Sequence, residues 1–416
     1  APVMLQGHMD MVCEKRAGVE HDFEKDGLDL IIRDGRLTAN GTTLGGDNGV
    51  AVALMLMVLD DDEIEHPPVE CVFTTEEEVG LNGAKALDKS VLKARTMINM
   101  DSEDEGVATV SCAGGLRVQF TKEIQRTTVQ GSLLTLKVEG LLGGHSGQDI
   151  DKERQNADLL MARMIQRLLK ETKGQLVSFN GGTKDNAIPR ECEASLIYES
   201  DEEAAKAEEL ACELAETYAE ELTPAEPDFS CEISCETNRT AEAIPQDAAK
   251  EFICAMRLAP NGIQKRNIKM DGFVVVSLNL GVVRTEEDRI VMIFSPRSSV
   301  ASLQEDTKER LNTLAETFGF TVSHSSEYPG WSFKEDSPVR EICKESYKEL
   351  FGEDLKIEAI HAGLECGLFS DAIKGLDAIA IGPTIANCHT PDEYLTLDSF
   401  ERFYEFLKDI LSRLAK

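Results

Sequence analysis

Acidic and histidine side chains stand at the ends of several short apolar runs in this sequence. The run 69–74 is followed, after one threonine, by three consecutive glutamates at 76–78, and Asp101 directly follows the run 96–100. Carboxylates this close together are costly to hold unless a cation or water balances their charge. A solvated acidic turn is the commoner explanation of an isolated triplet, so its meaning depends on the residues that would share a site with it.

Five residues in comparable positions form a candidate set of metal ligands. They are His8, Asp47, Glu78, Asp101 and His389. A mixed imidazole and carboxylate set suits Zn²⁺, with Mn²⁺ or Co²⁺ as alternatives. Five ligands are too many for one tetrahedral zinc and about right for two that share a carboxylate. Two metals roughly 3.5–4 Å apart can hold a bridging hydroxide and polarise a carbonyl together.

Two further carboxylates would serve such a centre. Glu77 is next to Glu78 and is the candidate general base. Neighbouring side chains on an extended strand point in opposite directions, so a local turn must bring both glutamates to one centre. Asp10 lies two residues after His8, on the same face of a strand, where it would hold the imidazole in place.

The elements that must position these residues follow an α/β pattern at both ends of the chain. We predict strands at 3–7, 69–74 and 96–100, a hairpin at 29–38, and helices at 49–59 and 83–88. After a return linker at 328–330 we predict helices at 336–351 and 398–414 and strands at 355–360 and 377–381. Ligands bind beyond the carboxyl ends of strands in open α/β sheets, where the candidate residues lie.

The pattern changes after residue 115. We predict strands at 131–139, 175–180, 191–199, 228–235, 271–283, 288–295 and 319–325, with helices at 151–172, 201–221, 246–258 and 302–318. This is the ferredoxin-like order extended by a second, partly similar round. The chain is therefore expected to have a discontinuous domain, 1–114 and 329–416, with a domain at 115–328 inserted into it.

Composition limits the classes of function. The 416 residues carry a net charge of -33, which argues against nucleic acid as a partner. No apolar run reaches the length of a membrane span, and no signal peptide is visible. The eleven cysteines are dispersed, which favours a reducing cytoplasm. Because the sequence begins directly on an apolar strand, we expect that a further segment precedes it.

Two groups of segments resemble a known family. The segments 8–12, 45–49, 75–80, 99–103 and 387–393 resemble the dinuclear zinc exopeptidases. The segments 140–147, 186–190, 295–299 and 361–367 are similar to one subfamily, the aminoacyl-histidine dipeptidases, also called cytosol non-specific dipeptidases. The resemblance covers essentially the whole chain. It implies a catalytic domain with a mixed sheet flanked by helices, an inserted α+β ferredoxin-like lid domain that also mediates dimerisation, and a cytoplasmic homodimer.

The resemblance also implies roles for the candidate ligands. His8 and Asp101 would hold one zinc, Glu78 and His389 the other, and Asp47 would bridge them. The peptide bond that follows the bridging aspartate is often cis in this family, and we expect the same of Asp47 and Asn48.

Further roles concern catalysis and the substrate. Glu77 would be the general base and Asp10 would orient His8. His145 would stabilise the oxyanion, in its own chain or in a partner subunit. Arg297 would bind the terminal carboxylate of the substrate, and Asn186 would contact it.

Several alternatives stay open. Relatives often have Asp where this chain has Glu76, which leaves the register of the triplet ambiguous by one residue. The expected activity is hydrolysis of Xaa-His and other dipeptides. A related amidohydrolase (an aminoacylase or a tripeptidase) with the same centre and a non-catalytic relative are the competing interpretations. Arg297 would equally pair with a surface acid, and His361 is interpreted as a structural residue.

Overall fold

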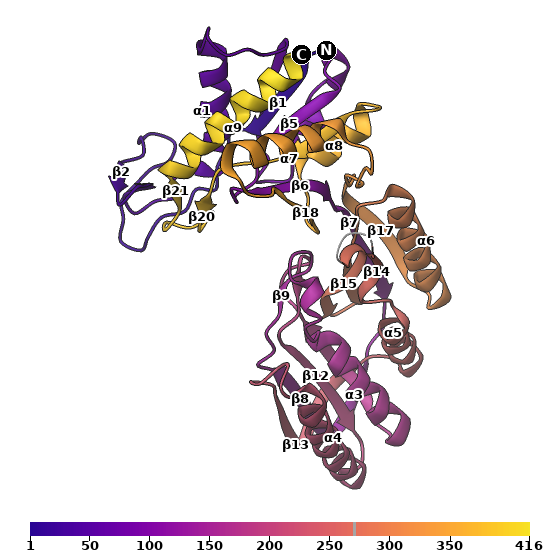
Figure 1. Cartoon of the computed structure of the whole chain (residues 1–416). Coiled ribbons are helices and arrows are strands. Elements are labelled where there is room, and N and C mark those ends of the chain that lie inside the picture. Colours follow the sequence, from indigo (N-terminus) through magenta and orange to yellow (C-terminus); the bar gives the residue numbers. More distant parts are fainter. Residues whose placement is uncertain (269–271) are drawn as a thin grey trace. The chain divides into compact units, whose positions relative to one another are not determined.

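The computed structural model describes residues 1–268 and 272–416 (Figure 1). The chain divides into two compact units. The first unit consists of Ala1–Ala113 and Tyr328–Lys416, and the second unit of Gly114–Glu327. Within the described part of the chain, no helix is both long and apolar enough to cross a membrane.

The first unit is built on a six-stranded mixed sheet. Its order is β18 (Lys356–Ile360), β6 (Val107–Cys112), β19 (Asp377–Ala380), β5 (Thr96–Asn99), β1 (Val3–His8) and β4 (Val69–Thr74). Strand β1 pairs in parallel with both β4 and β5, and β19 pairs in parallel with β5. Because these four strands run the same way, their carboxyl ends meet at one edge of the sheet.

Five α-helices flank this sheet: α1 (Gly46–Asp60), α2 (Asn82–Ala86), α7 (Pro338–Phe351), α8 (Glu365–Ala372) and α9 (Leu397–Ala415). A Cβ on Gly7 would lie 2.3 Å from that of Ala51, so α1 approaches β1 as closely as glycine permits. Helix α9 buries Phe403, Phe406 and Leu407, and the Phe406 ring lies 5.2 Å from that of Tyr347 on α7. The spacing of these apolar residues matches the helical period and explains why α9 forms.

A small second sheet in the first unit carries an important loop. Its order is β2 (Leu30–Arg33), β3 (Arg36–Ala39), β21 (Tyr394–Thr396) and β20 (Ile385–Ala386). Strands β20 and β21 are antiparallel and are joined by residues 387–393, which include His389. The predicted hairpin at 29–38 is present as β2 and β3.

The second unit contains one nine-stranded sheet made of two ferredoxin-like halves. One half has the order β13 (Ser230–Ala243), β8 (Thr127–Glu139), β12 (Cys192–Tyr198) and β10 (Gln175–Gly181); the other has β15 (Phe273–Thr285), β16 (Arg289–Ser298), β7 (Gly114–Glu123) and β17 (Thr321–Tyr328). When the four strands of each half are numbered along the chain, they lie in the order 4-1-3-2 from the outer edge of the sheet to its middle. The two halves join in the middle, where Gly181 pairs with Val283. Strand β14 (Gly262–Asn267) pairs with β15.

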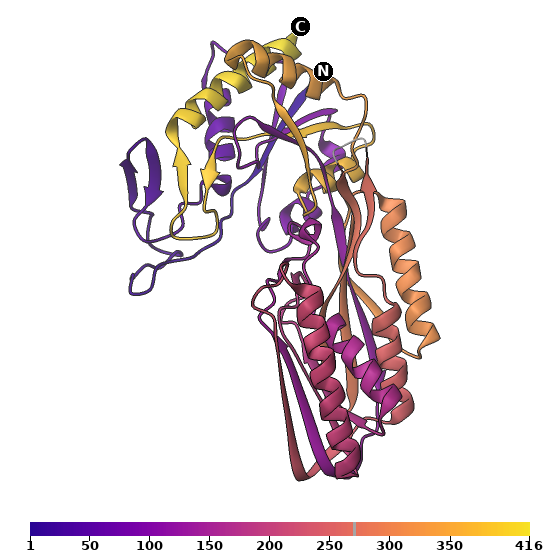
Figure 2. The same ribbon diagram turned by 60° about the horizontal axis from the view of Figure 1, so that its bottom comes forward.

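The helices of the second unit pack on its sheet. They are α3 (Ala157–Glu171), α4 (Asp201–Leu222), α5 (Gln246–Leu258) and α6 (Ala301–Thr317). Figure 2 shows them side by side on one face of the sheet. Buried residues such as Phe120, Phe179, Phe252 and Phe294 form a single core between the two layers. The two predicted ferredoxin-like rounds therefore share one continuous sheet and one core.

Several predicted boundaries were wrong. The helix predicted at 151–172 begins at Ala157, because Asn156 caps it and Glu153 adopts a left-handed φ of 51°. The segment 361–367, expected as a loop, already forms the start of α8 at Glu365. Strands β6, β7 and β14 were not predicted, and the predicted start of a strand at residue 271 lies outside the described residues.

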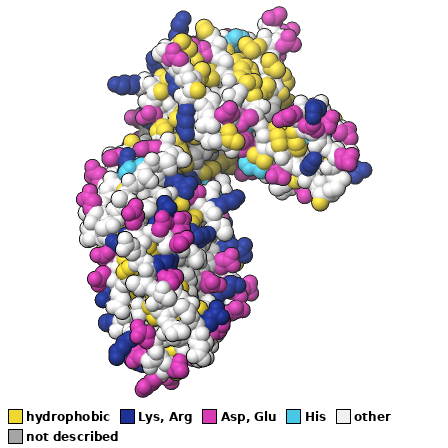
Figure 3. Space-filling model, turned by 180° about the vertical axis from the view of Figure 1, so that it is seen from behind, with side chains coloured by type: hydrophobic (Ala, Val, Ile, Leu, Met, Phe, Trp, Pro, Cys, Tyr) yellow, Lys and Arg dark blue, Asp and Glu magenta, His cyan; other side chains and the backbone are white. Residues whose placement is uncertain are grey.

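One face of the molecule shows how its charged side chains are distributed. On the face seen in Figure 3, acidic side chains are spread over both units and interspersed with basic ones. The eleven cysteines are all free, and Cys112, Cys192, Cys343 and Cys366 are buried.

Candidate metal centre

One side of the candidate centre lies where β1 and β5 end. His8 is the last residue of β1 and is 1% exposed. Its Nε2 lies 3.1 Å from Oδ1 of Asp47 and 3.5 Å from Oδ1 of Asp101. An imidazole nitrogen and two carboxylate oxygens therefore converge on one point in the buried edge of the sheet.

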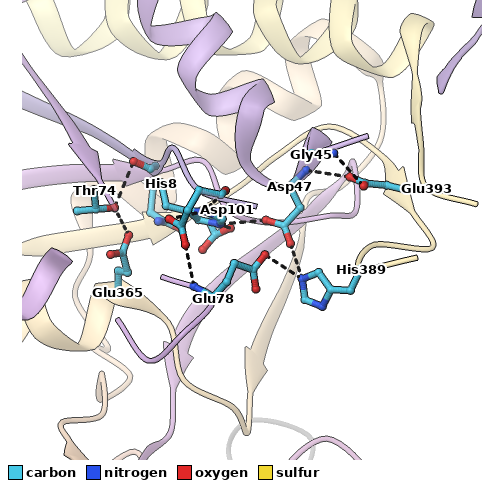
Figure 4. A network of polar contacts seen from close by, with 12 residues as sticks. His8, Gly45, Asp47, Thr74, Glu78, Asp101, Glu365, His389 and Glu393 are labelled. Atoms are coloured by element: carbon cyan, nitrogen blue, oxygen red, sulfur yellow. Dashed lines mark hydrogen bonds and ion pairs between the residues drawn. The ribbon is translucent and has the colours of Figure 1, made fainter. Parts of the chain in front are cut away.

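The other side of the centre shares Asp47. Its second oxygen, Oδ2, lies 3.1 Å from Nε2 of His389, and that nitrogen lies 3.1 Å from Oε1 of Glu78. Figure 4 shows the Asp47 carboxylate between the two histidines. The structure thus brings together all five candidate ligands, with one carboxylate common to both groups.

A local turn places Glu77 and Glu78 at this centre. Strand β4 ends at Thr74, Glu76 adopts a left-handed φ of 54°, and the carbonyl oxygen of Glu77 accepts hydrogen bonds from the amides of Gly80 and Leu81. The turn interrupts the alternation of the strand. Side-chain oxygens of Glu77 and Glu78 and a ring nitrogen of His8 consequently lie within 4.8 Å of one another.

Glu76 lies outside the cluster. Its side chain is exposed, and its Oε2 accepts a hydrogen bond of 3.1 Å from Nδ2 of Asn82. The three consecutive glutamates therefore have different surroundings, and the geometry favours the register in which Glu77 and Glu78 face the centre.

Asp10 contacts His8 mainly through its backbone. Nδ1 of His8 lies 3.0 Å from the carbonyl oxygen of Asp10 and 3.5 Å from its Oδ1. Because a carbonyl oxygen only accepts hydrogen bonds, Nδ1 carries the proton, and in the neutral ring Nε2 presents its lone pair to the centre. The carboxylate of Asp10 also accepts a hydrogen bond of 3.2 Å from the amide of Glu78.

The peptide bond between Asp47 and Asn48 is cis, as the resemblance implies. Asp47 and Asn48 lie at the start of α1 but have non-helical backbone angles. The Asp47 side chain therefore comes from just ahead of the regular part of the helix.

The charges of the centre are strongly coupled. Burial disfavours a charged His8, but the carboxylates of Asp101 and Asp47 outweigh it and raise the pKa of His8 to about 12. Asp47 and Glu78 raise the pKa of His389 to about 10. Burial, together with neighbouring negative charge, raises the pKa of Glu77 to about 8 and that of Asp101 to about 7.

These shifts indicate a deficit of positive charge in the cluster. Burial opposes ionisation of Asp47, yet the two imidazoles hold its pKa below the usual range. Oε1 of Glu78 is buried, and its polar contact is the ion pair with Nε2 of His389 at 3.1 Å. Imidazole nitrogens and carboxylate oxygens are the donors that Zn²⁺ and similar divalent ions prefer, so the residues present fit such ions.

Buried hydrogen bonds connect the strands at whose ends the candidate ligands lie. Oε2 of Glu365 on α8 accepts hydrogen bonds from Gln6 of β1 (2.5 Å) and Thr74 of β4 (2.6 Å). Asn99 of β5 donates to Oε1 of Gln6 at 2.7 Å. No role was predicted for Glu365, although it lies in one of the segments that carry the resemblance.

Glu393 is a second supporting carboxylate that sequence reasoning missed. Its oxygens accept hydrogen bonds from the amides of Leu44, Gly45 and Asp47. It follows His389 by four residues, so its place in a motif was the one signal that pointed to it.

The three remaining predicted residues belong to the second unit. His145 lies on β9 (Gly144–His145), which pairs with β11 (Ala187–Ile188), and the carbonyl oxygen of Asn186 accepts a hydrogen bond of 2.8 Å from the amide of Ser146. Burial lowers the pKa of His145, and so does the positive charge of Arg297. Arg297 lies on β16 and is 7% exposed.

The tautomer of His145 follows from its contacts. Its Nδ1 accepts hydrogen bonds from the amides of Gly147 (3.2 Å) and Gln148 (3.0 Å). An acceptor nitrogen carries no proton, so the neutral ring is protonated at Nε2. His145 is therefore held as a neutral hydrogen-bond donor.

Comparison with known proteins identifies the family of this chain. Residues 4–413 match the peptidase family M20/M25/M40. The chain belongs to this family. The predicted class of enzyme, a hydrolase that acts as a peptidase, is confirmed by this membership.

Two relatives match almost the whole of this M20 peptidase. The cytosol non-specific dipeptidase of Escherichia coli (strain K12) is 35% identical over 99% of this chain and 85% of its own length. The crystal structure of aminoacylhistidine dipeptidase from Vibrio alginolyticus is 36% identical, with a TM-score of 0.93, over 99% of this chain and 84% of that one. The predicted resemblance and fold class are thereby confirmed.

A more distant structure shares the fold alone. The aminopeptidase PepT from Bacillus cereus ATCC 10987 has 16% sequence identity and a TM-score of 0.52, over 100% of this chain and 81% of that one.

Proposed function

We propose that this M20 peptidase is a metal-dependent dipeptidase that cleaves Xaa-His and other dipeptides with two divalent metal ions, preferentially zinc. One observation carries the proposal: the two oxygens of Asp47 each lie 3.1 Å from a different histidine nitrogen, with Asp101 beside His8 and Glu78 beside His389. Both near-full-length relatives are described as dipeptidases, which supports the substrate class.

The ligands divide between the two ions. His8 and Asp101 would hold one ion, Glu78 and His389 the other, and Asp47 would hold both. Two such ions, when bound, supply Lewis acidity for the scissile carbonyl and favour ionisation of water near neutral pH.

Glu77 is the proton carrier of the reaction. It takes a proton from the attacking water and passes it to the leaving amine. In the metal-free fold burial raises the pKa of Glu77 to about 8. The positive charge of two bound ions would lower this pKa, so that the carboxylate can accept a proton near neutral pH. The carbonyl oxygen of Asp10 holds the ring of His8 in the tautomer that ligation requires.

The second unit acts as lid and dimerisation domain in this proposal. His145 donates a hydrogen bond from its Nε2–H to the oxyanion, Arg297 binds the terminal carboxylate of the dipeptide, and Asn186 contacts the substrate. The homodimer, the cytoplasmic location and the absence of nucleic-acid and membrane partners stay predictions.

A substrate panel tests the proposal. The protein loaded with Zn²⁺, Mn²⁺ or Co²⁺ is assayed on Xaa-His dipeptides, other dipeptides, tripeptides and N-acyl amino acids. We expect the highest kcat/KM on dipeptides, about two metal ions per chain by elemental analysis, and loss of activity with a chelator that added metal reverses. A preference for N-acyl amino acids would make the protein an aminoacylase, and a preference for tripeptides a tripeptidase.

A further inference from the structure

Glu393 binds the loop that carries Asp47 through backbone amides alone. The side chain is 2% exposed. Its Oε2 accepts hydrogen bonds from the amides of Leu44 (2.8 Å) and Gly45 (3.0 Å), and its Oε1 accepts one from the amide of Asp47 (3.2 Å). Hydrogen bonds from amides to a carboxylate are stronger than those between neutral groups, so this contact is firm.

The Asp47 loop needs such a contact because it has an irregular backbone. Gly45 has a left-handed φ of 68°, and Asp47 has a φ of -83° and a ψ of 101°, outside the helical range. Amides at the start of a helix have no intrahelical acceptor. Glu393 supplies the acceptors that this part of the loop would otherwise take from water.

The contact fixes the residue whose side chain links the two halves of the centre. The amide bound by Oε1 of Glu393 belongs to Asp47 itself, and the Asp47 carboxylate lies 3.1 Å from both His8 and His389. Little freedom remains nearby, since a Cβ on Gly46 would lie 3.2 Å from Oε1 of Glu393.

One short loop supplies both this contact and a candidate ligand. His389 and Glu393 lie between β20 and β21, and the amide of Glu393 donates to the carbonyl oxygen of Thr390 at 3.1 Å. The loop of His389 is therefore joined to the loop of Asp47 twice, once by Glu393 and once by the contact between His389 and Asp47.

We propose that Glu393 is a positioning residue for Asp47: it holds the Asp47 carboxylate across the two metal sites, so that binding of the second ion depends on it. This inference rests on the proposed two-metal function. It adds a residue that would touch neither metal nor substrate and would act through the backbone of the shared ligand.

Binding of Mn²⁺ to the full chain tests the proposal. Glu393→Gln replaces one acceptor oxygen by an amide group whose protons face backbone amides. We expect calorimetry to show two ions in the wild-type protein, and electron paramagnetic resonance to show that they are exchange-coupled. In Glu393→Gln the second ion should bind about 10–100-fold more weakly, and the coupled signal should disappear.

Glu70→Gln is the matched control. Glu70 also accepts hydrogen bonds from two consecutive backbone amides, those of Lys93 (2.9 Å) and Ala94 (2.9 Å), and it has no part in the centre. This variant should retain both ions and the coupled signal. Loss of coupling in both variants would reduce the role of Glu393 to general stability and overturn the proposal.

A second variant covers the case in which Glu393→Gln does not fold. Gly46→Ala places a methyl group against Oε1 of Glu393 and should weaken the second ion in the same direction. If every folded variant keeps two coupled ions, the proposal is wrong and the two-metal function stands. If the wild-type protein binds fewer than two ions, the two-metal function fails and this inference fails with it.

Discussion

Neighbouring residues of one chemical type lie in different surroundings here because the backbone turns between them. Glu76 is exposed and contacts Asn82, whereas Glu77 and Glu78 face the candidate centre. The left-handed backbone of Glu76 is the point of separation. Backbone conformation and burial thus separate Glu76 from Glu77, the proposed proton carrier, and Glu78, the proposed ligand.

Replacement of the proposed base tests this division. Glu77→Gln removes the group that exchanges the proton but keeps its size and an oxygen. We expect kcat on a dipeptide to fall by about 10²–10⁴-fold, while the number of bound metal ions stays at the wild-type value. Steady-state kinetics and elemental analysis of the same preparation measure both.

Glu76→Gln is the control for this measurement. Its side chain points away from the centre, so activity should stay close to wild type. Equal losses of activity in the two variants would mean that the register of the triplet is assigned wrongly.

At the scale of elements, strand ends were predictable and supporting contacts were not. Strands β1, β4 and β5 are short apolar runs, and the residues after them stood out as candidate ligands. Glu393 binds an amide 346 residues away, and a contact between a side chain and a distant backbone leaves no periodic pattern in the sequence. The same holds for the contacts that Glu365 makes with Gln6 and Thr74.

Errors in the second unit have two kinds of cause. Strand β7 buries Leu116, Val118 and Phe120 at alternate positions, so its period-two signal was present and unused. The start of α3 was predicted six residues too early, because residues 151–156 are polar and so resemble the exposed face of a helix. Only the cap at Asn156 shows where the helix begins.

The cap of α3 gives a prediction at this scale. Oδ1 of Asn156 accepts hydrogen bonds from the amides of Asp158 (3.0 Å) and Leu159 (3.2 Å), and its Nδ2 donates to the carbonyl oxygen of Leu280 (2.8 Å). Asn156→Ala should lower the free energy of unfolding by about 2 kcal/mol, the upper end of the range for caps, because a buried carbonyl also loses its donor.

Urea denaturation followed by circular dichroism measures this change. Ser200→Ala is the control, because Ser200 caps α4 through a longer, exposed contact of 3.4 Å with the amide of Glu203. Its loss should be the smaller of the two. A larger loss at Ser200 would contradict the importance given to burial of the cap.

At the scale of the whole molecule, the proposed metal ions would compete with protons for the centre. The pKa of Glu77 is raised from 4.5 to about 8 and that of Asp101 from 3.8 to about 7. The metal-free folded state therefore binds more protons than the unfolded state across this range, and its stability falls as pH rises. His8 and His389, with pKa values raised from 6.5 to about 12 and about 10, stabilise the metal-free fold below pH 6.5 and lose that effect at higher pH.

Metal binding should reverse this trend, because the ions bind the deprotonated ligands. We expect the difference in melting temperature between metal-loaded and chelated protein to widen from pH 5 to pH 9. Differential scanning calorimetry at a series of pH values measures it. Because the two melting temperatures are measured at the same pH, the effect of repulsion between the charges of the rest of the chain is common to both and cancels in the difference. A difference that did not change with pH would contradict the assignment of these residues as ligands.

The discontinuity of the first unit has a consequence for synthesis of the protein. Strand β19 lies between β6 and β5 in the sheet, and His389 follows it, so both come from the last part of the chain. A ribosome adds roughly 5–20 residues per second and delivers the whole second unit before them. During translation the emerging polypeptide carries His8, Asp47, Glu78 and Asp101 on an incomplete sheet. We therefore expect the centre to be completed only after the whole second unit has been synthesised, with its second ion acquired last.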